Sequence, residues 1–183
     1  GFYIQKRSLR YYDTPSAANV LGYISEVNEG DLAVNKYYVQ GELKGRTGVE
    51  RYYEDLLRGR KGVQYIQKDR FNRDIGPYKE GAIDTLPEQG KQISITIDKT
   101  LQEYGELLMN GKRGGIVAIE PATGEILSMI SGPTYDPSLL VGRERSKNYT
   151  KLYNDTIANP TWDRSIHARL SKPLMHLLHY KKV

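Results

Sequence analysis

The chain of 183 residues contains no cysteine, and it has only two phenylalanines, one tryptophan and three histidines. The absence of cysteine excludes disulfide bonds and thiolate metal sites, and it is compatible with an oxidising compartment without requiring one. The sequence also lacks an apolar run long enough to span a bilayer, and it has no secretory signal at its start. We therefore expect a piece of a longer protein whose membrane anchor lies outside it.

The net charge of +5 is localised at one end of the chain. The last twenty residues contain five bases and no acid, so residues 1–163 carry as many acids as bases. A neutral body with a basic tail is weak evidence for a phosphate-binding surface. We expect no nucleic-acid partner, and a module that binds nucleic acid or another anionic surface through this tail is the alternative.

All three histidines lie in the tail, residues 167–183. His176 and His179 have the spacing of a metal-binding pair, but no acidic or cysteine companion accompanies them, so we expect no metal site. The abrupt change of composition after Ile166 suggests out-of-frame or cloning-derived sequence as a hypothesis. We expect the tail to pack poorly, or to cover apolar surface of the strand at 116–119.

Residues 45–59 contain the clearest helical pattern. Apolar residues recur there at steps of three and four between two glycines, which predicts an amphipathic helix over residues 49–58. Tyr52, Tyr53 and Leu56 should pack inward, and Glu54 should form an ion pair with Arg58 one turn later.

The rest of the first half predicts short elements. They are an extended entry over residues 2–12, a helix that starts at Thr14-Pro15 and ends at Gly22, a turn at 28–31, a half-buried strand at 63–69 and an irregular connector at 70–91. The connector is the predicted domain boundary.

The second half predicts a strand, a helix and a hairpin. Ile93, Ile95 and Ile97 alternate with polar residues as a strand would, and Asp98 should cap a helix that runs to Met109. Leu101, Tyr104 and Leu108 share one face of that helix. Residues 115–131 should form a β-hairpin that turns at Pro121-Ala122-Thr123-Gly124. The predicted fold class is α+β.

Several short sequence motifs are more specific than these patterns. The motif G-x-x-G-V-E-x-x-Y-E-x-x-L-x-G at residues 45–59 resembles the last short motif in the non-catalytic N-terminal module of class B penicillin-binding proteins. Arg10-Tyr11-Tyr12 and Leu21-Gly22-Tyr23-Ile24 resemble the family's R-x-Y-P and L-G-Y-I, with Asp13 in place of the proline. T-I-D-x-x-L-Q at 96–102 and the P-x-T-G-E-I-L segment from Pro121 resemble the start of the transpeptidase domain.

The resemblance implies a pedestal, or dimerisation, domain over residues 1–90 and a truncated N-terminal part of a transpeptidase domain over 91–166. The parent would be an elongation-type enzyme anchored by a transmembrane helix, facing the periplasm or outer side of the cytoplasmic membrane, that binds penicillin and cross-links peptidoglycan. Its partners would be other cell-wall synthesis proteins, among them a membrane glycosyltransferase, and a homodimer is possible. No cofactor is implied. The structural or interface candidates are Arg10, Tyr12, Gly22, Tyr23, Gly45, Gly48, Glu50, Tyr53, Glu54, Leu56 and Gly59.

A catalytic serine is not among these candidates. Enzymes of this family need a serine followed one helical turn later by a lysine, and S-x-x-K occurs nowhere in the chain. Asp163-Arg164-Ser165-Ile166 resembles the stretch that precedes the nucleophile, and the family pattern ends there. Ser146-Lys147-Asn148 spells the S-x-N triplet of these enzymes but lies before that point, so we expect it in a polar loop. We therefore expect no catalysis by this chain.

Overall fold

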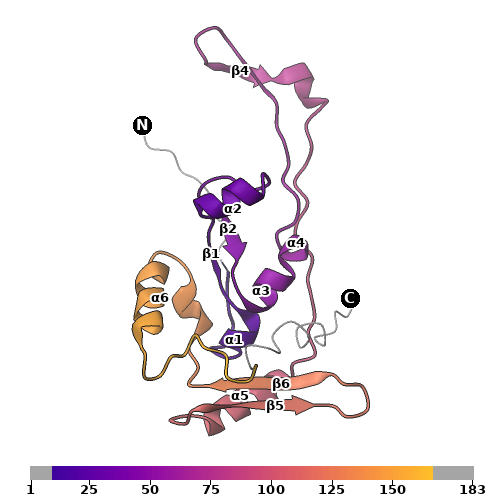
Figure 1. The fold of residues 1–183 in the computed structure, drawn as a ribbon. Helices are drawn as coiled ribbons and strands as arrows, with labels where there is room; N and C mark the ends of the chain where they lie inside the picture. Colours follow the sequence, from indigo (N-terminus) through magenta and orange to yellow (C-terminus); the bar gives the residue numbers. More distant parts are fainter. Residues whose placement is uncertain (1–9, 167–183) are drawn as a thin grey trace.

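The computed structural model describes residues 10–166, and it has an elongated shape with three parts (Figure 1). The first part, in the middle of the molecule, consists of short helices and one two-stranded sheet. Its β1 and β2 are antiparallel, with Ser25 opposite Lys44. The elements are α1 (Ala18–Leu21), β1 (Ile24–Glu26), α2 (Glu29–Val34), β2 (Leu43–Gly45), α3 (Gly48–Tyr52) and α4 (Glu54–Leu57).

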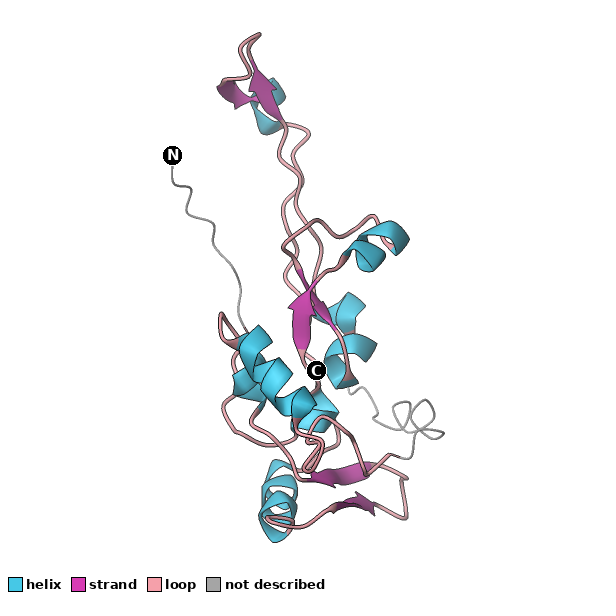
Figure 2. Cartoon of the chain, turned by 60° about the vertical axis from the view of Figure 1, so that its left-hand side comes forward, coloured by secondary structure: helices cyan, strands magenta, loops and turns pink. Residues whose placement is uncertain are grey.

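The second part is a long arm that rises from α4 to one end of the molecule (Figures 1 and 2). Two extended segments form its stem, joined by bridges between Arg60 and Glu88 and between Val63 and Thr85. Its tip is an antiparallel hairpin followed by one 3-10 turn. The elements are β3 (Ile66–Lys68), β4 (Asp74–Pro77) and η1 (Tyr78–Gly81).

The third part lies at the opposite end, with a further helix beside the middle part (Figure 1). Its hairpin pairs β5 with β6 in antiparallel register, Val117 opposite Met129, and α5 packs on β6. The elements are α5 (Lys99–Leu108), β5 (Gly114–Ile119), β6 (Ile126–Gly132), η2 (Pro137–Leu140) and α6 (Arg145–Asn154).

Two apolar clusters join the first and third parts. In one cluster, Val20 of α1 and Val49 of α3 pack with residues of β6. In the other, Ala18 packs with Tyr135 and Leu140. The core therefore lies between elements that are far apart in sequence, and burial of this apolar surface holds the two parts together.

The predicted helix over 49–58 is two helices, because the backbone leaves helical geometry at Tyr53, where φ is −103° and ψ is 20°. The prediction that its apolar face packs inward is wrong for Tyr52, which is 45% exposed. Tyr53 and Leu56 are half-buried. Because the backbone departs from helical geometry at Tyr53, the apolar residues before and after it do not share one face. A pattern based on a single regular helix does not predict this.

Four other predictions for the first half are corrected. The first helix ends at Gly22 as expected but begins at Ala18, because Ala17 has a left-handed backbone with φ 59°. Residues 28–31 are not a turn: Asn28 and Asp31 form a reciprocal capping box that starts α2. The predicted half-buried strand at 63–69 exists only as β3, all of it exposed, and the predicted irregular connector contains β4 and η1.

In the second half, the capped helix and the hairpin are confirmed. Residues 93–97 form no strand of the described sheets, although Ile93, Ile95 and Ile97 are half-buried and pack against the first cluster. The face of α5 that carries Leu101, Tyr104 and Leu108 is exposed, and Gln102 and Gly105 are buried instead.

The predicted polar loop around Ser146 is wrong as well, since it lies in α6. Ile116 and Ile119 of β5 are exposed to solvent. Residues 2–9 of the predicted entry segment and the tail, with its histidines, lie outside the described residues. Among residues 10–166, no helix is both long and apolar enough to cross a membrane.

Candidate functional site

The candidate residues of the first part gather around α3 and α4. Glu50 of α3 accepts two hydrogen bonds from the Arg10 guanidinium, at 2.8 Å from Nε and 3.0 Å from Nη2. Glu50 is 8% exposed, so this pair ties the first described residue to a nearly buried carboxylate. Burial raises the pKa of nearby Tyr12 to about 12, and the negative charge of Glu50 acts in the same direction.

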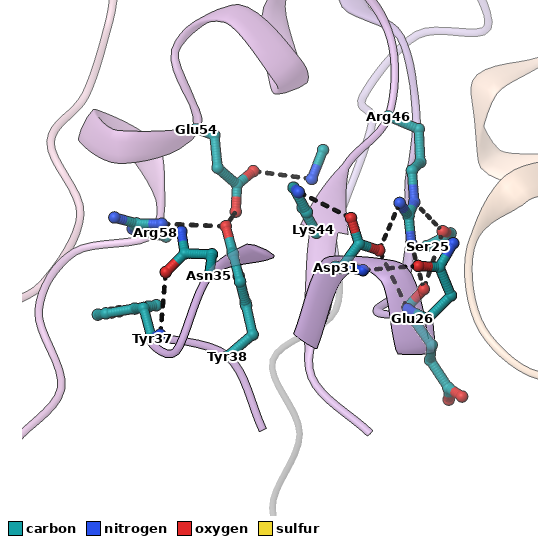
Figure 3. Close-up of polar contacts among 12 residues, drawn as sticks. Ser25, Glu26, Asp31, Asn35, Tyr37, Tyr38, Lys44, Arg46, Glu54 and Arg58 are labelled. Carbon is teal, nitrogen blue, oxygen red and sulfur yellow. Dashed lines mark hydrogen bonds and ion pairs between the residues drawn. The ribbon is translucent and has the colours of Figure 1, made fainter. Parts of the chain in front are cut away.

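Glu54 joins three segments by hydrogen bonds (Figure 3). Its Oε2 accepts from the Gly45 backbone N–H at 2.7 Å, and its Oε1 accepts from the Tyr38 hydroxyl at 2.9 Å. The Tyr38 hydroxyl in turn accepts from Arg58 Nη1 at 3.0 Å. Glu54 and Arg58 therefore both bond to the Tyr38 hydroxyl in place of the predicted ion pair. The ion-pair partner of Arg58 is Asp55, at 2.6 Å.

A second polar cluster, beside β1 and β2, was not predicted (Figure 3). Asp31 of α2 accepts from Lys44 at 2.8 Å and pairs with Arg46 at 2.7 Å. The hydrogen bond from Lys44, joined by those from the Asn28 backbone and Arg46, holds the pKa of Asp31 well below its usual range. The signal available in the sequence was the Asn-x-x-Asp spacing of a capping box.

The candidate glycines mark places where backbones meet. Gly22 ends α1 and Gly48 begins α3, and the two lie against each other. Gly45 lies under α3, where a Cβ would be 2.2 Å from the Glu50 carbonyl oxygen. The Gly59 carbonyl accepts from the Tyr37 hydroxyl at 3.2 Å, and Tyr23 packs its ring on Tyr149, with 5.4 Å between centroids.

These contacts define a scaffold. Each charged candidate pairs with another side chain or with the backbone, and none of the candidates brings a nucleophile to a base. A groove of about 860 Å³ runs beside them, and its lining mixes acids and bases, among them Arg10, Glu42, Glu54 and Lys61. Within residues 10–166, no group of three or more acidic or histidine side chains is placed to hold a metal ion.

Comparison with known proteins gives the class of this scaffold. Residues 1–95 match the family model of the penicillin-binding protein dimerisation domain. The match covers more than half of the chain, so the chain belongs to this family.

Its relatives include curated transpeptidases. The peptidoglycan D,D-transpeptidase MrdA of Escherichia coli K12 is 38% identical over 155 residues, which are 80% of this chain and 24% of that protein. The MrdA protein of Acinetobacter baumannii is 34% identical over 169 residues, or 91% of this chain and 24% of the relative. The chain thus spans about a quarter of the length of these relatives.

Solved structures of penicillin-binding proteins are similar to this chain and support the family assignment. The chain is similar to the penicillin-binding protein PBP2 of Helicobacter pylori in its complex with MreC, with a TM-score of 0.71 and 29% identity over 85% of this chain and 29% of that one. It is also similar to Pseudomonas aeruginosa PBP2 in complex with WCK 5153, with a TM-score of 0.64 and 34% identity over 85% of this chain and 30% of that one. The predicted resemblance to class B penicillin-binding proteins and the α+β fold class are confirmed.

Proposed function

We propose that this chain is a non-catalytic placement module of a class B penicillin-binding protein in peptidoglycan synthesis. Residues 1–90 would be the pedestal, residues 91–166 the beginning of the transpeptidase domain, and residues 167–183 an atypical tail. The proposal rests on the contacts made by two acids of the family motif. Glu50 accepts a hydrogen bond from Arg10, and Glu54 accepts hydrogen bonds from Tyr38 and from the backbone. Residues engaged in this way support structure.

The parent protein would supply catalysis and membrane attachment. By relation to the MrdA proteins, it would act as a D,D-transpeptidase outside the cytoplasmic membrane, with an anchor that precedes this region. Its partners would be other cell-wall synthesis proteins, with a membrane glycosyltransferase and a second copy of the chain as candidates. The alternative, an anionic-surface module acting through the tail, finds no support in the relatives.

Partner contact is the function that the exposed surface supports. The arm carries large apolar side chains on a thin stem and hairpin with no core of their own, and Phe71, Ile75 and Leu86 are exposed. Apolar surface of this kind commonly marks a protein-binding site. The arm carries both acids and bases, and ion pairs such as Lys68–Asp74 neutralise part of them. This mixed charge favours a protein partner over a polyanion.

The non-catalytic role is tested with a fluorescent penicillin. We expect no covalent label on the chain at concentrations that label an active penicillin-binding protein, because acylation needs an activated serine. One bound β-lactam in the intact mass would contradict the proposal.

Partner contact is tested with the MreC protein encoded by the same genome, because the H. pylori relative was solved in complex with MreC. Phe71→Ser with Ile75→Ser should weaken binding by at least about tenfold, whereas the matched change Leu107→Ser, at the opposite end of the molecule, should not. Equal binding by the arm variant would rule out the arm as the contact surface.

A further inference from the structure

The open edge of β6 is occupied by a side chain of α5. Met129 lies opposite Val117 of β5, yet both of its backbone polar groups are taken by Gln102. The Met129 N–H donates to Gln102 Oε1 and its carbonyl accepts from Gln102 Nε2, each at 2.9 Å. Gln102 is 1% exposed. A buried side-chain amide thus takes the place of a neighbouring strand at this point of the sheet edge.

The helix that carries Gln102 packs against β6 at Gly105, which contacts the Ile130 side chain. A Cβ built on Gly105 would be 2.1 Å from Ile130 Cδ1. Any larger residue would have to displace the end of the Ile130 side chain, which is only 2% exposed. The two hydrogen bonds between Gln102 and Met129 hold α5 on β6, and Glu106 follows Gly105 on the same helix.

Glu106 connects this helix to the first part of the molecule. Its Oε1 accepts from Gln102 Nε2 at 2.8 Å and from the backbone N–H of Ala17, also at 2.8 Å. Ala17 lies 89 residues earlier, immediately before α1. Its left-handed backbone, with φ 59°, is unfavourable for a residue with a Cβ, so the surrounding contacts must hold it there.

We infer that Glu106 is a positioning residue that sets how α1, and with it the first part of the molecule, is placed on α5 and β6. Hydrogen bonds run without a break from Met129 through Gln102 and Glu106 to Ala17. The apolar cluster of Val20 and Ile126 supplies adhesion between the same parts, but apolar contacts are not directional. Glu106 supplies the direction. This inference concerns the connection between the parts and goes beyond the proposed function.

Other polar contacts between the parts are weaker candidates for this role. Lys99 and Asp13 pair at 3.0 Å, but both side chains are more than half exposed, and exposed pairs contribute little. Arg145 donates to the Ile24 carbonyl at 3.3 Å, which is near the upper limit for a hydrogen bond.

Hydrogen exchange followed by mass spectrometry tests the inference on the full chain. Glu106→Ala removes the acceptor of Ala17, so amides of residues 17–22 should exchange about tenfold faster, while those of β6 at 126–131 keep their protection. Glu106→Gln keeps an acceptor oxygen and should exchange as the unchanged protein does. Glu103→Ala, an exposed position on the same helix, is the matched control and should have no effect.

Two outcomes would overturn the inference: unchanged exchange at 17–22 in Glu106→Ala, or equal acceleration in Glu103→Ala. If Glu106→Ala does not fold, Glu106→Asp replaces it. This variant keeps the charge but withdraws the carboxylate by one methylene, and it must reproduce the faster exchange at 17–22. Failure of Glu106→Asp to do so would equally refute the role of Glu106, whatever the outcome of the penicillin and MreC experiments.

Discussion

Gly22 and Gly48 lie back to back where α1 ends and α3 begins. A Cβ on Gly22 would be 2.0 Å from the Thr47 carbonyl oxygen, and a Cβ on Gly48 would be 2.4 Å from the Val20 carbonyl oxygen. Both residues also have positive φ, 80° and 59°. The two glycines, which belong to separate family motifs, therefore contact each other. This close approach lets Val20 and Val49 on either side join the same apolar cluster.

Gly48→Ala should destabilise the chain by about 3 kcal/mol or more, because the methyl group meets backbone and the left-handed conformation is unfavourable. Urea denaturation measures this. Gly124→Ala is the matched control: Gly124 has φ 78° but open space around its Cβ position, so only the conformational cost of about 1 to 2 kcal/mol applies. Similar losses in the two variants would show that the close approach does not matter.

Glu50→Gln should cost about 1 to 3 kcal/mol, since it removes the charge from a nearly buried carboxylate that accepts two hydrogen bonds from Arg10. Asp13→Asn breaks an ion pair that is exposed on both sides and should change stability by less than about 1 kcal/mol. Thermal melting at neutral pH compares the two. A smaller loss for Glu50→Gln than for Asp13→Asn would contradict the scaffold role of Glu50.

Stability should fall at alkaline pH in part through Tyr12. Its pKa is raised to about 12, against about 10 in an unfolded chain. The folded protein keeps this proton where the unfolded chain loses it, so the contribution of Tyr12 is complete below about pH 10 and is lost between about pH 10 and 12. Tyr12→Phe should reduce that loss in denaturation curves measured across this range. Tyr11→Phe, at a neighbouring position that is 88% exposed, should not.

Leu56→Ala should destabilise the protein by about 1 to 2 kcal/mol, because Leu56 is only half-buried. The same substitution of a fully buried leucine costs about 2 to 5 kcal/mol. Leu107→Ala, on the exposed side of α5, should stay within about 0.5 kcal/mol. If the two variants have the same unfolding midpoint, the packing of Leu56 of α4 does not contribute to stability.

Local features of this protein were determined by the sequence alone. Asp98 caps α5 and Gly22 ends α1, since these depend on hydrogen bonds and backbone freedom within a few residues. The hairpin of β5 and β6 follows from its turn and its apolar strands. The family motifs likewise identified Glu50, Glu54 and the glycines as a group, but not what each contacts.

The tertiary structure decided every feature that depends on partners distant in sequence. The helical period placed Leu101 and Leu108 on one face of α5, yet Gln102 and Gly105 are the residues that are buried. A strand edge offers hydrogen bonds that the Gln102 amide satisfies and a leucine does not. Glu106 meets Ala17 across 89 positions, and no local spacing predicts that. Short-range patterns reflect short-range energies, whereas the placement of one part on the other results from packing and hydrogen bonds formed only when the whole chain is folded.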